Sequence, residues 1–146
     1  MNSSFSLEKI AQQAQQASHT LVSMGAEGRS HLLQQFSCLI EKHQDDILEA
    51  NTLDLEASRE MAVPDIMLDW LRLTPERIQA TAQLLEGLAQ SFDPLEQVGN
   101  PTYPIHGAQS YSQRLPLGVI GLVYESLPQL GAIAAGLCIR SGNALI

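Results

Sequence analysis

Apolar residues recur every three or four positions through most of the first 92 residues, which is the spacing of amphipathic helices. The most regular stripe joins Leu32, Leu33, Phe36, Leu39 and Ile40 and predicts a helix over 27–43. Other signals predict three more helices: a high Ala and Gln content over 8–24, acidic residues before 47–61, and Pro64 in the first turn of 64–73. A further apolar stripe predicts a helix that begins after residue 74. The N-terminal region is therefore expected to be helical.

Helix-boundary signals agree with these spans. Ser6 precedes the first helix and can cap it with its hydroxyl group, and Gly25 is a typical C-terminal stop. Thr74-Pro75 is the strongest start signal, because Thr can accept a hydrogen bond from the first turn and Pro suits the first helical position. Pro94 disfavours a helical residue before it, so we place the end of the helical region there.

The pattern changes after Pro94. Turn-forming residues at Gly99-Asn100-Pro101 and His106-Gly107 separate short extended pieces, which predicts a hairpin or a pair of exposed arms. The run LGVIGLVY at 117–124 is continuously apolar, as expected of a strand covered on both faces of a parallel sheet. An Ala- and Gly-rich helix over 129–142 and a second apolar run at 143–146 would complete a βαβ unit.

These elements predict an α/β protein with three parts. Residues 1–92 form a helical region, 93–116 a β arm or hairpin, and 117–146 the start of a cofactor-binding type of α/β sheet. A sheet of two strands is poorly covered, and its last strand would present an unpaired edge. We therefore expect self-association into a homodimer or larger oligomer, through the arm at 96–115 or by strand pairing between copies.

Charge and composition narrow the functional classes. The chain has 16 acidic and 8 basic residues, and its formal net charge of −8 argues against nucleic acids and anionic membranes as partners. No apolar run is long enough to span a membrane, and the N-terminus lacks the features of a signal peptide. Two cysteines do not make a disulfide framework, so a cytoplasmic location is the simplest expectation.

The first candidate site is the turn ESLPQ at 125–129, which follows the first strand of the predicted βαβ unit. Open α/β sheets bind ligands at the carboxyl ends of their strands, so the turn could hold a cofactor or substrate. It could equally be an ordinary connection between a strand and a helix. No G-x-G-x-x-G follows the strand, and we interpret Gly118 and Gly121 within it as positions of close backbone packing.

The remaining reactive residue types give no clear constellation. Cys38 and Cys138 lie on apolar stretches of predicted helices, and we expect both to be inert buried thiols rather than nucleophiles. The four histidines lack the spacing of metal ligands, and no metal site is expected.

Longer motifs carry a family resemblance. The stretch RLPLGVIGLVYESLPQ, followed by SGNALI, resembles the gamma-glutamyl phosphate reductases, or glutamate-5-semialdehyde dehydrogenases, of the aldehyde dehydrogenase superfamily. Upstream, ILEANTLDLEASRE, MLDWLRLTPERIQATAQLLEGLA and DPLEQV occur in the order of that family. The resemblance implies that 117–146 form the first βαβ unit of an aldehyde-dehydrogenase-type Rossmann-like sheet.

The resemblance also implies an activity. The family reduces gamma-glutamyl 5-phosphate with NADPH to glutamate-5-semialdehyde and phosphate, a step of proline biosynthesis. A cysteine thiolate displaces phosphate to form a thioester, which hydride from the nicotinamide then reduces. In the family that cysteine lies beyond position 146, and neither Cys38 nor Cys138 matches it. The chain is therefore expected to be a truncated N-terminal portion that is inactive alone.

The resemblance assigns site residues in the turn. Five consecutive residues would contact NADP: Tyr124, Glu125, Ser126, Leu127 and Pro128. A catalytic role would fall on the residue after them, Gln129.

The family turn reads Tyr-Glu-Ala-Arg-Pro-Asn, so this chain departs from it at two important positions. Leu127 replaces an Arg that could pair with an anionic substrate. Gln129 replaces the Asn of the oxyanion site and is one methylene longer, which displaces its donor.

Two hypotheses of different class follow. The chain is the N-terminal part of such a reductase, or it is a non-catalytic remnant or paralogue that acts as an oligomerisation or binding module. The residues at 127 and 129 favour the second hypothesis. An unrelated helical interaction domain is a third possibility, and the order of the linked motifs argues against it.

Overall fold

The computed structural model describes residues 6–99 and 111–146. Six helices run in chain order: α1 (Leu7–Ser23), α2 (Gly25–Lys42), α3 (Gln44–Glu60), α4 (Asp65–Leu71), α5 (Pro75–Gln90) and α6 (Gln129–Arg140). Four short strands are β1 (Val98–Gly99), β2 (Ser112–Gln113), β3 (Val119–Ile120) and β4 (Ala144–Leu145). The structure confirms a helical N-terminal region followed by an arm and a βαβ unit.

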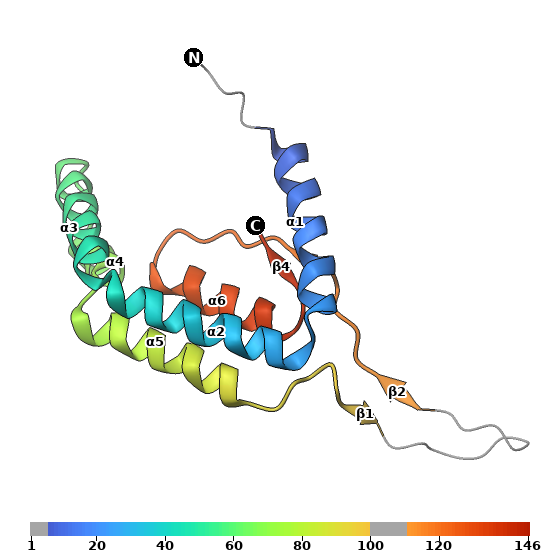
Figure 1. Ribbon diagram of the computed structural model, residues 1–146. Helices are drawn as coiled ribbons and strands as arrows, with labels where there is room; N and C mark the ends of the chain where they lie inside the picture. Colours follow the sequence, from blue (N-terminus) through green and yellow to red (C-terminus); the bar gives the residue numbers. More distant parts are fainter. Residues whose placement is uncertain (1–5, 100–110) are drawn as a thin grey trace, which may run out of the picture.

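Helices α2, α5 and α6 pack side by side and form the centre of the molecule (Figure 1). Leu33 of α2 and Leu85 of α5 are fully buried between them, together with Ala89. Gly136 lets α6 lie close to this pair, because a Cβ atom there would overlap the Leu85 side chain. Helices α3 and α4 extend from one end of this layer, and α1 lies at the other end (Figure 1).

The boundary signals act as the sequence predicts. The Ser6 hydroxyl accepts a hydrogen bond from the Lys9 N–H (3.3 Å), and the Thr74 hydroxyl accepts one from the Arg77 N–H (3.2 Å). Gly25 has φ +70°, a left-handed conformation that separates α1 from α2 at little steric cost for a glycine.

Strands β3 and β4 pair in parallel, with Val119 opposite Ala144 and Ile120 opposite Leu145. The N–H of Ala144 donates to the Gly118 carbonyl oxygen (2.8 Å), and the N–H of Leu122 donates to the Ile146 carbonyl oxygen (2.8 Å). Helix α6 forms the crossover between the two strands, so the predicted βαβ unit is confirmed. The paired segment is shorter than the predicted strand at 117–124, and Val123 is 96% exposed.

The base of the predicted arm is a hairpin. Strands β1 and β2 pair antiparallel, with Val98 opposite Gln113 and Gly99 opposite Ser112. The predicted turns at Asn100-Pro101 and His106-Gly107 lie outside the described residues. The hairpin extends away from the helical layer (Figure 1).

Two expectations about packing are wrong. Cys38 is exposed, because its neighbours Phe36 and Ile40 occupy the inward face of α2 instead. A Cβ atom on Gly118 or Gly121 would meet nothing within 4 Å, so neither glycine marks a close backbone approach. Gly118 has φ +109°, and this backbone conformation explains the glycine there.

Within the described ranges, no helix is both long enough and apolar enough to cross a membrane.

Candidate functional site

The loop between β3 and α6 lies at the carboxyl end of a strand in a parallel sheet, where α/β proteins place their ligands. It leads directly into the 12-residue helix α6, whose N-cap residue Pro128 makes no side-chain capping hydrogen bond. Amide groups in an uncapped first turn and the helix dipole both favour negative charge. Local structure therefore makes this end of α6 suitable for an anionic ligand group.

Leu127 holds an unusual backbone conformation near the end of this loop, just before α6. Its φ is +60°, which is costly for a side chain as bulky as Leu. The Leu127 carbonyl oxygen accepts a hydrogen bond from the Leu130 N–H (2.8 Å), so the strained residue closes the turn into α6. Its side chain is 39% exposed and carries no charge, and it supplies no direct partner for an anion.

Tyr124 anchors the middle of the loop against α6. Its phenol ring lies on Gly131, and a Cβ atom on that glycine would be 2.5 Å from the Tyr124 Oη atom. Glu125 is exposed and Ser126 is half-buried. The predicted cofactor residues 124–128 thus form the continuous second half of this loop, and Tyr124 and Pro128 lie against the helical layer.

The Gln129 side chain lies where α6 faces α2 and α5. It lines a cleft of about 260 Å³ with Phe36 and Ile78, and a second cleft of about 230 Å³ with Arg77 and Thr81. The Gln129 Oε1 atom is buried and has no hydrogen-bond partner among the described residues. This orientation turns the amide oxygen toward α2 and α5, and any oxyanion role would fall to the amide nitrogen.

Neither thiol is suited to be the nucleophile. Burial raises the pKa of Cys138 and keeps it protonated at neutral pH, where a thiol attacks slowly. Cys138 sits near the C-terminal end of α6, at the opposite end of the helix from Gln129. Cys38 is exposed on α2. The described part of the chain therefore contains no thiol beside the β3–α6 loop.

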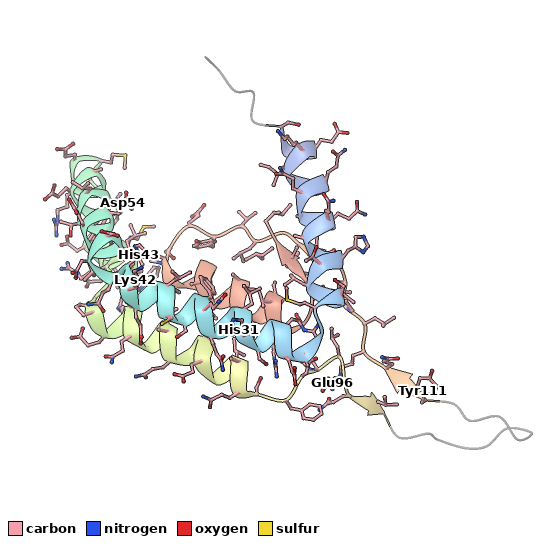
Figure 2. All side chains as sticks on the ribbon, in the orientation of Figure 1. His31, Lys42, His43, Asp54, Glu96 and Tyr111 are labelled. Carbon is pink, nitrogen blue, oxygen red and sulfur yellow. The ribbon has the colours of Figure 1, made fainter. Side chains whose placement is uncertain are left out.

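No metal-binding cluster is found where the structure describes the chain, since no three His, Cys, Asp or Glu side chains come together there. His31 and His43 lie apart along α2, one near its middle and one just beyond its end (Figure 2). His43 instead pairs with Asp46 on the next helix, at 2.9 Å.

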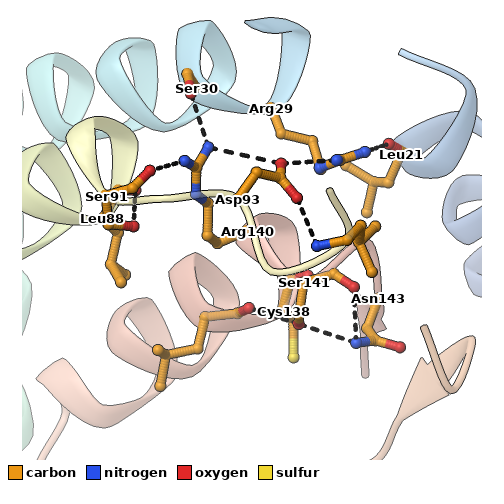
Figure 3. Close-up of polar contacts among 12 residues, drawn as sticks. Leu21, Arg29, Ser30, Leu88, Ser91, Asp93, Cys138, Arg140, Ser141 and Asn143 are labelled. Atoms are coloured by element: carbon orange, nitrogen blue, oxygen red, sulfur yellow. Dashed lines mark hydrogen bonds and ion pairs between the residues drawn. The ribbon is translucent and has the colours of Figure 1, made fainter. Parts of the chain in front are cut away.

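The structure contains a buried polar cluster that the sequence pattern did not predict. Arg29 of α2 and Arg140 of α6 converge on Asp93, with the Arg29 Nη2 atom 2.7 Å and the Arg140 Nη1 atom 3.8 Å from the Asp93 Oδ2 atom (Figure 3). One signal was available: Arg29 precedes Leu33 by four positions and Ser37 by eight, so it shares their buried helix face.

Hydrogen bonding fixes the charge of Asp93. Burial alone would raise the pKa of its carboxyl group, but hydrogen bonds from Arg29 and from the Leu95 N–H, together with the charges of both arginines, lower it overall. Asp93 is therefore an anion at neutral pH, and it ties the start of the arm to α2 and α6.

A comparison with known protein families identifies the class of the protein. The aldehyde dehydrogenase family model matches residues 3–125, and the chain belongs to that family.

Curated relatives narrow the resemblance. The chain is 47% identical over 140 residues to gamma-glutamyl phosphate reductase 2 of Synechocystis sp., covering 96% of this chain and 33% of the relative. It is 41% identical over 140 residues to the gamma-glutamyl phosphate reductase of Enterococcus faecalis, covering 96% and 34%. The chain thus spans about a third of the length of the curated relatives it matches.

Solved structures agree with the sequence comparison. The chain superposes on the gamma-glutamyl phosphate reductase of Saccharomyces cerevisiae with a TM-score of 0.87 at 30% identity, over 94% of this chain and 35% of that one. For the enzyme of Thermotoga maritima the TM-score is 0.88 at 27% identity, over 95% and 34%. The predicted family resemblance and the α/β fold are confirmed.

Proposed function

We propose that the chain is the N-terminal part of a reductase that converts gamma-glutamyl 5-phosphate to glutamate-5-semialdehyde in proline biosynthesis. The observation that carries this proposal is the 47% identity to gamma-glutamyl phosphate reductase 2 across 96% of the chain. The parallel β3–β4 pair and its loop, at the site where α/β proteins bind ligands, support it.

The β3–α6 loop would contribute one part of a nicotinamide cofactor site. The uncapped first turn of α6 fits a negatively charged group of NADP, since amide groups there favour anions. The approach to that turn would be lined by the five residues before it: Tyr124, Glu125, Ser126, Leu127 and Pro128. When bound, NADPH supplies the hydride, and these residues would bind and orient it.

Gln129 would be the residue of this chain nearest the reacting carbonyl group. Its amide nitrogen could donate to a developing oxyanion, which is the usual task of a side-chain amide in acyl-group chemistry. The longer side chain and the inward-facing Oε1 atom make Gln129 a poorer donor than Asn would be. We therefore expect Gln129→Asn to improve catalysis in a full-length protein that carries this segment.

Two measurements test the proposal on the 146-residue chain. Titration of NADPH, followed by its fluorescence, should show saturable binding. We expect this binding to be weak, because the uncapped first turn of α6 is only one part of the cofactor site. An assay in the reverse direction, with glutamate-5-semialdehyde, phosphate and NADP, should show no NADPH formation, because the chain lacks the family's nucleophilic cysteine. Turnover by this chain alone would contradict that assignment, and absence of any NADPH binding would remove the cofactor role.

A second candidate function is an oligomerisation or binding module. Exposed apolar side chains support it, because Leu117 is 86% and Val123 96% exposed beside a sheet of two strands. On this interpretation the chain self-associates through the β1–β2 hairpin or the sheet edge and works in the cytoplasm without nucleic acid or membrane partners. Light scattering at increasing protein concentration tests it, and a monomer at every concentration would contradict it.

A further inference from the structure

Strand β3 has one paired edge and one free edge. The backbone of Gly118, Ile120 and Leu122 faces β4, since the first two accept hydrogen bonds from it at their carbonyl oxygens and the third donates to it. Successive residues of a strand turn their backbone groups to alternate edges, so those of Val119 and Gly121 face the other way. In the described part of the chain β3 pairs with β4 alone, and this second edge has no strand beside it.

The segment that carries the free edge of β3 is apolar and uncharged. No Asp, Glu, Lys or Arg occurs in the run 115–124. Within the run, Leu117 is 86% and Val123 96% exposed, and the chain between β3 and α6 follows one margin of the molecule (Figure 1). Edge strands are usually protected by charged side chains or by a covering element. This edge is therefore suited to pair with another extended strand through main-chain hydrogen bonds.

The charges at the two ends of the uncharged run indicate its partner. Arg114 precedes the run and Glu125 follows it, and both side chains are exposed. If two copies of the run pair antiparallel, the positive end of each meets the negative end of the other. A parallel arrangement would bring like charges together, which is unfavourable between paired strands. The run is therefore complementary to a second copy of itself in the antiparallel orientation.

The backbone groups at the free edge of β3 determine the register. A two-fold axis at Ile120 places Val119 of one copy opposite Gly121 of the other, so the N–H and carbonyl groups of the two residues can bond. The same axis places Leu117 opposite Val123, because each lies three positions from Ile120. Two highly exposed apolar side chains would then cover each other, which stabilises a pair of strands.

We propose that two copies of this chain pair antiparallel through the free edge of β3 and join their sheets into one, in the order β4–β3–β3–β4. Arg114 and Glu125 lie six and five positions from the axis, so each Arg114 comes beside the Glu125 of the other copy. The β3 pairing specifies the interface of the self-association proposed above and depends on it. The β1–β2 hairpin takes no part in this interface.

The first test is sedimentation equilibrium of the 146-residue chain at increasing concentration, which should show a monomer–dimer equilibrium. Gly121→Pro should weaken dimerisation by about tenfold or more, because it removes the outward N–H twice in each dimer and spares the β3–β4 hydrogen bonds. Gly121→Ala is the matched control, since it keeps the N–H and its Cβ atom would meet nothing within 4 Å. It should dimerise like the wild type.

The second test reverses the charges at the ends of the run. Arg114→Glu and Glu125→Arg should each weaken dimerisation several-fold, and the double variant should restore it, because the opposite charges meet again. Glu125→Arg reduces the negative charge of each copy, so general repulsion alone would predict tighter association. Arg59→Glu, an exposed change on α3 with the same effect on net charge as Arg114→Glu, is the control and should weaken dimerisation less.

Each outcome of these tests separates the interface from self-association in general. A chain that stays monomeric at every concentration would overturn both. A dimer that tolerates Gly121→Pro, or whose double charge variant is no tighter than the single ones, would leave self-association standing and overturn the β3 interface. Circular dichroism checks that each variant is folded, and if Gly121→Pro unfolds the chain, the charge reversals decide. Amide exchange at Val119 and Gly121 should also slow as the dimer forms, and unchanged exchange would count against the pairing.

Discussion

Arg29 and Asp93 lie 64 positions apart in the sequence, yet their side chains form a buried ion pair with a 2.7 Å separation. Asp93 also accepts a hydrogen bond from the Leu95 N–H (2.8 Å), which fixes the turn where the chain leaves the helical layer. Arg140 reaches the same carboxylate from α6 and donates to Ser30 and to the Ser91 carbonyl oxygen. This junction therefore holds α2, α6 and the arm in one arrangement.

Removal of the Asp93 charge should destabilise the fold strongly. Asp93→Asn leaves two buried guanidinium groups without a counter-charge, and loss of one partner of a buried ion pair costs about 3–5 kcal/mol. Urea unfolding followed by circular dichroism measures the change. Asp54→Asn, an exposed change on α3, is the matched control and should alter stability by less than about 0.5 kcal/mol. Equal effects of the two substitutions would show that the cluster contributes nothing.

Acid should weaken the same contact. The folded-state pKa of Asp93 lies below the ordinary carboxyl value of about 3.9. A group with a lowered folded-state pKa contributes fully above its unfolded pKa, and that contribution disappears as the pH falls through the folded-state pKa. The stability difference between the wild type and Asp93→Asn should therefore be constant from neutral pH to about pH 5 and shrink below about pH 4. A difference that stays constant into strong acid would contradict this sign.

Much of the helical region could be predicted because its apolar positions follow the helical period and its ends carry capping residues. Ser6, Gly25 and Thr74 mark boundaries that the structure confirms. The exposure of Cys38 could not be predicted from its apolar neighbours Phe36, Leu39 and Ile40. The buried face of α2 is set by Arg29, Leu33 and Ser37, two of them polar. A hydrophobic criterion cannot find a face whose polar members are satisfied by distant partners.

The sheet and the site were predictable to different degrees. The β3–α6–β4 unit followed from two apolar runs and a helix between them. The early end of β3 could not be predicted, because the exposure of Val123 depends on what packs against this end of the sheet. The strain at Leu127 and the inward orientation of the Gln129 oxygen also depend on tertiary packing. The roles of residues 124–129 stay predictions.

Close packing of α6 on α2 and α5 should require Gly136. A Cβ atom there would overlap the Leu85 side chain and lie 3.2 Å from the Leu88 Cδ1 atom. Gly136→Ala should therefore destabilise the chain by about 1–3 kcal/mol through overpacking. Gly87→Ala on α5 is the matched control, because its Cβ meets nothing within 4 Å. That change should stabilise the helix by about 0.5–1 kcal/mol. Thermal unfolding of both variants measures the contrast, and a shift in the same direction for both would be inconsistent with it.

The strain at Leu127 should be removable. Leu127 and Ala62 both have positive φ, at +60° and +57°. Glycine adopts this conformation freely, so Leu127→Gly should relieve about 1 kcal/mol of backbone strain. Ala62→Gly tests the same conformation in a turn far from the loop and should give a similar gain. Chemical denaturation compares them. A loss of stability for Leu127→Gly alone would mean that the Leu127 side chain contributes packing that outweighs the strain.

The two cysteines should differ sharply in reactivity. Cys38 is exposed on α2, whereas Cys138 is buried and burial raises the pKa of its thiol. Only the thiolate attacks a disulfide reagent, so at pH 8 one thiol should react within the first phase and the other only as the protein opens. Ellman's reagent measures both phases, and Cys38→Ser should abolish the fast one. In concentrated urea the two thiols should react alike, because the burial that protects Cys138 is lost. A fast phase that survives Cys38→Ser would mean that Cys138 is accessible, and the packing around α6 would then be looser than the structure shows.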